Sequence, residues 1–151
     1  MTNRWFTYDV RVQPHHTDYS GVVWHGTYIQ WLEAARVECL RSLQFSFEEF
    51  VAAGFDLPVV DLQLQYRQSL LLGDLASVKT RLEPQQGIRL VWQYEIENSL
   101  AANEGARVTG QVTLVPVSMT NRKIARRLPP PLQDSLSKLH QYFDIKPGAQ
   151  S

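Results

Sequence analysis

One stretch of this chain is apolar around most of a helical turn. Between residues 26 and 43 hydrophobic side chains fill most positions, and the polar interruptions are few: Gln30, Glu33, Arg36, Glu38 and Arg41. A surface helix normally has one apolar stripe and one polar face. This composition therefore predicts a long helix that the rest of the chain covers on nearly all sides.

After residue 57 the hydrophobic period changes from helical to alternating. Val60, Leu62, Leu64 and Tyr66 are separated by polar residues, which predicts a half-buried strand within residues 57–69. The same reasoning, with turn residues as boundaries, predicts strands at 4–13, 75–82, 88–97 and 106–117. Ser46 and Glu49 have capping-box spacing for a short helical turn at 45–50.

The order strand, helix, four antiparallel strands predicts an α+β fold in which a five-stranded antiparallel sheet wraps around the helix. With 151 residues the chain is most simply one domain, 1–151. Its core is expected at about 4–131. Three prolines, 129–131, are expected to break the chain before a short C-terminal helix within 132–143 and a loose tail.

Such a sheet leaves an open edge, because five strands cannot enclose a helix about 27 Å long. Proteins rarely leave a long strand edge unpaired. We therefore expect a homo-oligomer, with two copies joined edge to edge as a dimer or in a tetramer. The alternative is a monomer whose helix is partly exposed.

Composition limits the partners and the location. Lys and Arg number 15 and so do Asp and Glu, so the formal net charge is zero and gives no general attraction to nucleic acid or membranes. The four cations at 122–127 are a weak nucleic-acid footprint. No apolar run approaches the ~20 residues that span a bilayer, and no signal peptide begins the sequence. A cytoplasmic protein is expected.

The residues exclude several chemistries. Cys39 is the single cysteine and fits a small buried hydrophobe, so no disulfide or thiolate metal site is predicted. Two adjacent histidines, His15 and His16, and the separate His25 do not complete a metal-ligand set. Nucleophile-elbow, phosphate-loop and dinucleotide motifs are absent. We expect no metal and no cofactor.

The remaining chemistry lies just before the helix. Asp18 precedes a Ser20-Gly21 turn, and the helix then begins near His25. Free N–H groups in a first helical turn can bind the oxygen of a polarised carbonyl. A carboxylate facing that carbonyl can attack it, or deprotonate a water that does. Acyl transfer to water is the reaction class that these residues favour.

Each residue also has a structural alternative. Asp18 fits a turn or N-cap acid equally well, and Gly21 fits a backbone requirement under either interpretation. Trp24 and Tyr28 fit a plain core as well as the walls of a cleft for a flat acyl group. Glu33 fits an i,i+3 pair with Arg36.

The run Asp18-Tyr-Ser-Gly-Val-Val-Trp-His25, followed by Tyr28 and Glu33-Ala-Ala-Arg36, resembles the signature of hotdog-fold acyl-CoA thioesterases of the 4-hydroxybenzoyl-CoA thioesterase type. The resemblance extends over about 8–131. It implies an acyl-CoA substrate, with CoA as part of that substrate, and an oligomer. It also implies that Asp18 is the nucleophile or base and that the amide of His25 polarises the thioester. Many relatives carry a second acid where this chain has His16.

Within that family the chain looks most like the 1,4-dihydroxy-2-naphthoyl-CoA hydrolases of phylloquinone and menaquinone synthesis. Hydrolysis of 4-hydroxybenzoyl-CoA or a short-chain acyl-CoA, or acyl-CoA or acyl-carrier binding without chemistry, are the alternatives. The resemblance predicts a substrate site formed by the following residues: Gly21, Val22, Val23, Trp24, Tyr28, Tyr66 and Arg67. Candidate partners for the CoA phosphates are Arg67, Arg89, Lys123, Arg126 and Arg127.

Overall fold

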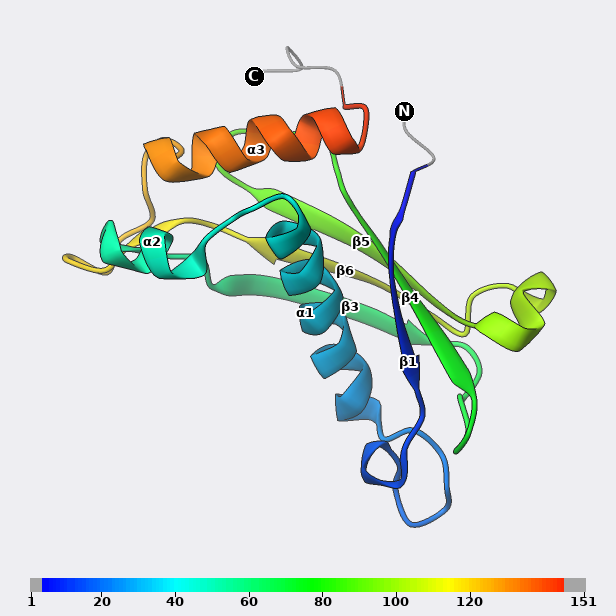
Figure 1. Cartoon of the computed structure of the whole chain (residues 1–151). Helices are drawn as coiled ribbons and strands as arrows, with labels where there is room; N and C mark the ends of the chain where they lie inside the picture. Colours follow the sequence, from blue (N-terminus) through cyan, green and yellow to red (C-terminus); the bar gives the residue numbers. More distant parts are fainter. Residues whose placement is uncertain (1–3, 146–151) are drawn as a thin grey trace.

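A five-stranded antiparallel sheet crosses behind one long helix in the computed structural model, which describes residues 4–145 (Figure 1). The spatial strand order is β1-β4-β5-β6-β3. The strands span Phe6–Arg11 (β1), Val59–Tyr66 (β3), Leu75–Leu82 (β4), Leu90–Asn98 (β5) and Val108–Leu114 (β6), and the helix α1 spans His25–Ser42. The predicted α+β sheet and its five main strands are confirmed.

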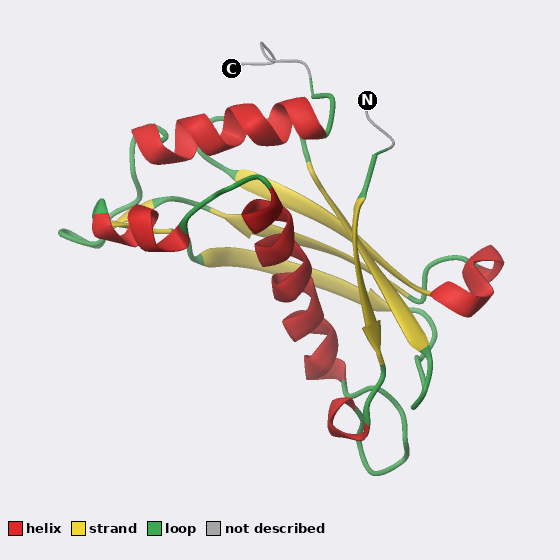
Figure 2. Ribbon diagram, in the orientation of Figure 1, coloured by secondary structure: helices red, strands yellow, loops and turns green. Residues whose placement is uncertain are grey.

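Most of the smaller elements lie near the two ends of α1, and one 3-10 segment lies at the end of the sheet away from it (Figure 2). A 3-10 turn, η1 (Pro14–His16), precedes α1, and α2 (Phe47–Ala52) follows it. β2 (Phe55–Asp56) pairs with β7 (Val117–Ser118), and η2 (Ser99–Glu104) joins β5 to β6. The two-residue strands and η1 are too short to give a periodic signal, and the sequence did not predict them.

Two local predictions about helix starts have different outcomes. The side chain of Ser46 accepts a hydrogen bond from Glu49 N (3.1 Å), which confirms it as the N-cap of α2. The prolines, however, do not break the chain before a helix that begins at residue 132, as was predicted. α3 spans Pro130–Tyr142, so Pro130 and Pro131 begin the helix. A proline fits there because first-turn N–H groups have no intrahelical acceptor.

α1 is buried along one stripe, which corrects the prediction that it is covered nearly all round. Its buried residues recur at helical spacing: Thr27, Tyr28, Trp31, Leu32, Ala35, Arg36, Cys39 and Leu40. The opposite side, including Ile29 and Glu33, is exposed. The reason is that the sheet, with α3 at one end, covers a single side of the helix in this chain (Figure 1).

The core between α1 and the sheet includes one buried polar contact. Trp92, Tyr94 and Ile96 occupy alternate positions of β5 and are each at most 2% exposed. Arg36 of α1 is also buried, and its Nη1 donates to the Tyr94 hydroxyl at 3.1 Å. Burial raises the pKa of Tyr94, so this phenol stays protonated and accepts from Arg36 as a neutral group.

The strand β3 is largely exposed, which corrects the prediction of a half-buried strand. Val60 and Tyr66 are 51% and 49% exposed, and Leu62 is 40% exposed. β3 is an edge strand that pairs with β6 on one side only. The alternating pattern was recognised, but β3 lies at the edge of the sheet and no strand covers its outer side within residues 4–145. Of these side chains Tyr66 reaches the start of α1, where its hydroxyl donates to His25 O. Among residues 4–145 no helix is long and apolar enough to cross a membrane.

Candidate active site

Asp18 lies at the start of a tight turn between η1 and α1. Its N–H donates to Val22 O (2.8 Å), and its carbonyl accepts from Gly21 N (3.1 Å). Gly21 has φ +76°, a backbone conformation that side chains other than glycine's disfavour. The Asp18 Oδ1 atom accepts from Ser20 N (2.8 Å) and Val22 N (3.4 Å). Asp18 is therefore a turn acid, as the structural alternative predicted. The two hydrogen bonds to Oδ1 orient the carboxylate, and Oδ2 takes part in neither of them.

The beginning of α1 is fixed by the backbone of His16. The His16 carbonyl accepts from Trp24 N (3.0 Å) and from Thr27 Oγ1 (2.9 Å). No side chain caps the first turn, in which His25 is the first residue. The first-turn amides, which carry the positive end of the helix dipole, are thus not occupied by a capping side chain.

His16 itself is held as a neutral ring. Its Nδ1 accepts from Gln13 N at 2.9 Å, and its ring lies edge-on to Trp31. Desolvation and the neighbouring His15 lower the pKa of His16. His16 is thus a structural histidine that stabilises the loop.

The segment after β3 forms the opposite wall. Leu70 N donates to the Tyr28 hydroxyl (3.1 Å), and Leu70 O accepts from Val23 N (3.0 Å). Leu72 N donates to Gly21 O (3.0 Å). Tyr28 is buried, and burial raises its pKa, so its phenol is an uncharged acceptor for Leu70. These bonds join the Asp18 loop, α1 and the post-β3 segment into one unit.

A pocket of about 320 Å³ opens between these three parts. This volume is at the lower end of the range for small-molecule sites, about 300–1,000 Å³. The pocket is lined by Asp18, Val23, His25, Tyr28, Tyr66, Arg67, Gln68 and Ser69. The Tyr66 hydroxyl donates to His25 O at 3.1 Å, and the Tyr28 and Tyr66 rings are 5.5 Å apart. A carboxylate, a helix start and aromatic surface therefore meet in one place.

The structure brings together six of the nine residues predicted for the site. Gly21, Val22 and Trp24 do not line the pocket. Gly21 and Val22 shape the turn instead, and the Trp24 ring is 49% exposed and packs against His25. Gln68 and Ser69 were missed, although they directly follow Tyr66 and Arg67 as the chain leaves the strand. The catalytic roles of Asp18 and His25 stay predictions.

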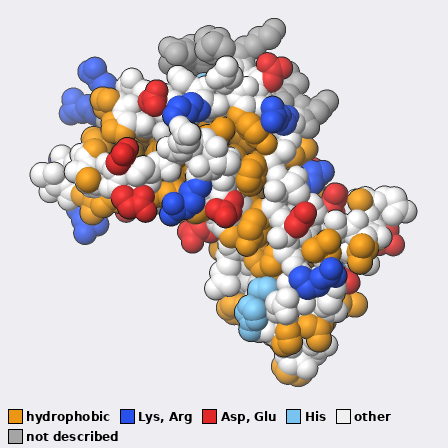
Figure 3. Space-filling view, in the orientation of Figure 1, with side chains coloured by type: hydrophobic (Ala, Val, Ile, Leu, Met, Phe, Trp, Pro, Cys, Tyr) orange, Lys and Arg blue, Asp and Glu red, His pale blue; other side chains and the backbone are white. Residues whose placement is uncertain are grey.

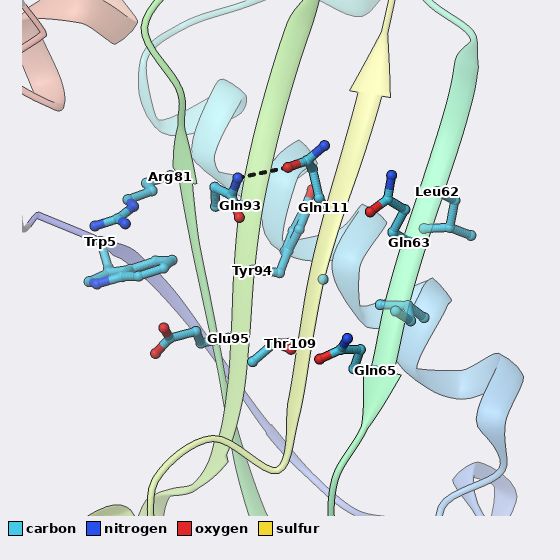
Figure 4. Close-up of a pocket in the computed structure, with 12 residues that line it drawn as sticks. Trp5, Leu62, Gln63, Gln65, Arg81, Gln93, Tyr94, Glu95, Thr109 and Gln111 are labelled. Carbon is cyan, nitrogen blue, oxygen red and sulfur yellow. Dashed lines mark hydrogen bonds between the residues drawn. The ribbon is translucent and has the colours of Figure 1, made fainter.

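A larger hollow, about 590 Å³, lies on the sheet face opposite α1 (Figure 4). Glutamine side chains dominate it, and Gln93 Nε2 donates to Gln111 Oε1 at 2.9 Å. Trp5 and Arg81 lie at its β1–β4 side. The hollow has one acid among its lining residues, Glu95, and no helix begins there. The smaller pocket is therefore the better candidate for acyl transfer. Within residues 4–145 no group of three His, Cys, Asp or Glu side chains is placed to hold a metal ion.

Comparison with known proteins identifies the family. Residues 20–99, more than half of the chain, match the thioesterase superfamily. This chain belongs to the thioesterase superfamily. The resemblance that the Asp18–Arg36 motif indicated is confirmed, and so is thioester hydrolase activity.

Relatives of this thioesterase include two cyanobacterial proteins. A "putative esterase" of Synechocystis sp. is 52% identical over 93% of this chain and 84% of its own length. A 1,4-dihydroxy-2-naphthoyl-CoA hydrolase of Synechocystis sp. is 29% identical over 89% of this chain and 96% of its own length. An acyl-CoA thioester hydrolase of Escherichia coli is 31% identical over 66% of this chain and 74% of its own.

Solved structures agree on the fold. A 1,4-dihydroxy-2-naphthoyl-CoA thioesterase from Synechocystis superposes with a TM-score of 0.80 at 27% identity, covering 90% of this chain and 98% of that one. The DHNA-CoA thioesterase from Staphylococcus aureus gives 0.79 at 27% identity, covering 97% of each. The hotdog thioesterase fold is thereby confirmed, and the chain acts on acyl-CoA thioesters.

Replacing Asp18 by Asn is expected to lower kcat for thioester hydrolysis by about 100- to 10,000-fold, the usual contribution of a positioned base. The amide oxygen of Asn still accepts from Ser20 N and Val22 N, so the free energy of unfolding should change by only about 0.5 kcal/mol. Release of free CoA thiol and urea unfolding provide the two measurements.

Asp74→Asn is the matched control. Asp74 Oδ2 caps a neighbouring turn by accepting from Leu71 N (2.9 Å), and Asp74 does not line the pocket. This variant should keep near wild-type turnover. Equal activity losses in the two variants would show that Asp18 acts only through turn structure.

Proposed function

We propose that this thioesterase hydrolyses an aromatic acyl-CoA in the pocket at the start of α1, with Asp18 and the His25 N–H as the reacting groups. The observation that carries the proposal is that Asp18 and His25 line one pocket together with the aromatic side chains of Tyr28 and Tyr66. The larger hollow on the outer face of the sheet has no helix start.

The helix start stabilises the negative charge that develops on the thioester oxygen. In the transition state this oxygen becomes an oxyanion, and the His25 N–H lies at the positive end of α1. The carboxylate faces the same pocket, with Oδ1 held by two backbone N–H groups. Oδ2 is therefore the atom that we assign to the reaction.

Two routes use this arrangement. In the first, Oδ2 bonds to the thioester carbon and the C–S bond breaks, which releases the CoA thiolate. One water then hydrolyses the mixed anhydride: its oxygen joins the acyl carbon, Asp18 is restored as a carboxylate, and the remaining proton passes to the thiolate. In the second, Asp18 removes a proton from water, the resulting hydroxide attacks the carbon, and the proton ends on the departing thiolate. Both routes consume one water and yield a carboxylic acid and free CoA.

For the acyl group we propose 1,4-dihydroxy-2-naphthoate, which places the enzyme in phylloquinone or menaquinone synthesis. Its flat bicyclic ring suits the Tyr28 and Tyr66 surfaces. Two naphthoyl-CoA thioesterases of the same fold at 27% identity support this choice.

A different acyl group is the second candidate, and one comparison favours it. Synechocystis sp. has both a 29% identical 1,4-dihydroxy-2-naphthoyl-CoA hydrolase and a separate 52% identical putative esterase. The chain is therefore much more similar to the protein whose name gives no naphthoyl substrate. Other aromatic and short-chain acyl-CoAs belong in the same test.

For the assembly we propose that β3 pairs with β3 of a second copy. Val60, Leu62 and Tyr66 are exposed on this edge strand, whose outer side has no partner strand among residues 4–145. In an antiparallel pair, the beginning of one β3 lies beside the end of the other. The pocket lies at the Tyr66 end, so the partner's Val59 end would lie near its mouth.

The Val59 end also carries a basic segment. Val115 N donates to Pro58 O, and the chain then passes through β7, whose Val117 bridges to Ile124. Beside Ile124 the exposed cations are Arg122, Lys123, Arg126 and Arg127. Figure 3 shows Lys and Arg side chains at the end of the molecule near α2, and histidines at the opposite tip, near the start of α1. We propose that this segment of the partner subunit holds the CoA phosphates.

A screen of acyl-CoAs by thiol release tests the proposed reaction. We expect the highest kcat/KM for 1,4-dihydroxy-2-naphthoyl-CoA and lower values for 4-hydroxybenzoyl-CoA and short-chain acyl-CoAs. A higher kcat/KM for one of the other substrates would replace the naphthoyl assignment. Absence of turnover with every thioester, together with tight binding, would overturn the proposed reaction.

Reversing two charges in the basic segment tests the CoA subsite. Arg126→Glu with Arg127→Glu should raise KM for acyl-CoA by about tenfold, because two phosphate partners become repulsive, while kcat stays near wild type. KM for the corresponding pantetheine thioester, which lacks the nucleotide phosphates, should not change.

The control carries the same change in net charge elsewhere. Arg41→Glu with Lys138→Glu replaces two exposed cations on α1 and α3. It should leave both KM values near wild type. Equal effects of the two double variants, or equal effects on the two substrates, would contradict the assigned subsite.

A further inference from the structure

The pocket wall formed by residues 67–70 is held from behind by one buried arginine. Arg107 is 7% exposed and stands directly before β6. Its carbonyl accepts from Arg67 N (2.8 Å) and Gln68 N (3.1 Å). Its Nη1 donates to Ser69 O at 3.0 Å. Three successive residues of the wall are thus bonded to Arg107, two through its backbone and one through its side chain.

The guanidinium is fixed by a second bond. Arg107 Nη2 donates to Glu104 Oε1 at 2.7 Å, which ties the wall to η2 at the same end of the sheet (Figure 1). The Glu104 side chain is 52% exposed, whereas that of Arg107 is 9% exposed. A planar guanidinium offers two N–H directions in a rigid fork, so it can hold Ser69 O and Glu104 at once; a lysine ammonium is a compact point charge on a flexible stem.

The position of this wall also determines the position of the Asp18 loop. After Ser69, Leu70 bonds to Tyr28 on one side and to Val23 on the other. Leu72 bonds to Gly21, and Asp18 closes the same turn through Val22. Because each of these bonds joins neighbouring residues of the wall and the loop, a shift at Ser69 changes where the carboxylate lies relative to the helix start.

We infer that Arg107 is a positioning residue of this thioesterase: its side chain sets the place of the pocket wall and, through Leu70 and Val23, of the Asp18 loop. The inference rests on the proposed reaction at Asp18. Arg107 does not line the pocket, so it acts without touching the substrate. Its effect should therefore appear in kcat, which depends on the geometry of attack, more than in KM.

Arg107→Met tests this inference, since methionine keeps an unbranched side chain and removes every side-chain N–H donor. We expect kcat to fall by about 10- to 100-fold, as misplacement of a reacting group by about 1 Å does, with KM within about threefold of wild type. Hydrogen exchange at the amides of residues 67–70 and Val23 should become about tenfold faster. Arg107→Lys should recover part of the lost kcat, and Glu104→Gln, which keeps the Ser69 bond, should stay within about twofold of wild type.

Arg36→Met is the control for a merely structural effect. Arg36 is equally buried, at 7%, and likewise donates to one neutral oxygen, that of Tyr94. It should lower the melting temperature as Arg107→Met does and leave kcat and the exchange of residues 67–70 unchanged. Wild-type kcat in Arg107→Met, or equal kcat losses in Arg36→Met and Arg107→Met, would overturn the inference.

Two further outcomes separate this inference from the proposed function. If Arg107→Met does not fold, the folded Lys variant decides, because wild-type kcat and exchange in it would overturn the inference. If the wild-type protein hydrolyses no thioester, the proposed function fails, but exchange at residues 67–70 still tests whether Arg107 holds the wall.

Discussion

The start of α1 depends on how the helix packs against the sheet. Its buried stripe, from Tyr28 through Leu32 and Ala35 to Leu40, fixes the helix against the sheet and thereby fixes where its first turn lies. Because the Tyr28 hydroxyl also accepts from Leu70 N, the same packing places the pocket wall. Tyr28 thus belongs to both the core and the site. The packing that stabilises the fold therefore also positions the first turn of α1 and the pocket beside it.

Polar contacts, in addition to this packing, hold the first turn of α1 and the Asp18 carboxylate in place. The His16 carbonyl holds the first turn of α1, and Ser20 and Val22 hold Oδ1 of Asp18. Each of these bonds has a backbone group as donor or acceptor, and all of them lie within residues 16–27. A turn acid and a catalytic acid are therefore compatible descriptions of Asp18, since the bonds that satisfy the turn also limit where the carboxylate can point.

Much of this could be read from the sequence, and the exceptions have physical causes. Alternation predicted β3, β4 and β5 because side chains on neighbouring positions point to opposite faces. Alternation did not show that β3 is an exposed edge strand. A hydrophobic pattern indicates which face of the sheet a side chain lies on, and not what covers that face. The motif from Asp18 to Tyr28 predicted four of the eight pocket residues, and the family resemblance added Tyr66 and Arg67. Gln68, Ser69 and Arg107 were not predicted, because their roles come from hydrogen bonds between segments about 40 residues apart.

The central claim is that one carboxylate and the first amide of α1 face the same carbon. A crystal structure with a ketone analogue of the acyl-CoA, in which a methylene replaces the sulfur, tests it most directly. The account predicts the carbonyl oxygen at about 3 Å from His25 N and Oδ2 of Asp18 about 3–3.5 Å from the carbonyl carbon. An analogue bound on the glutamine-lined outer face of the sheet, or one whose carbonyl lies away from both groups, would contradict it.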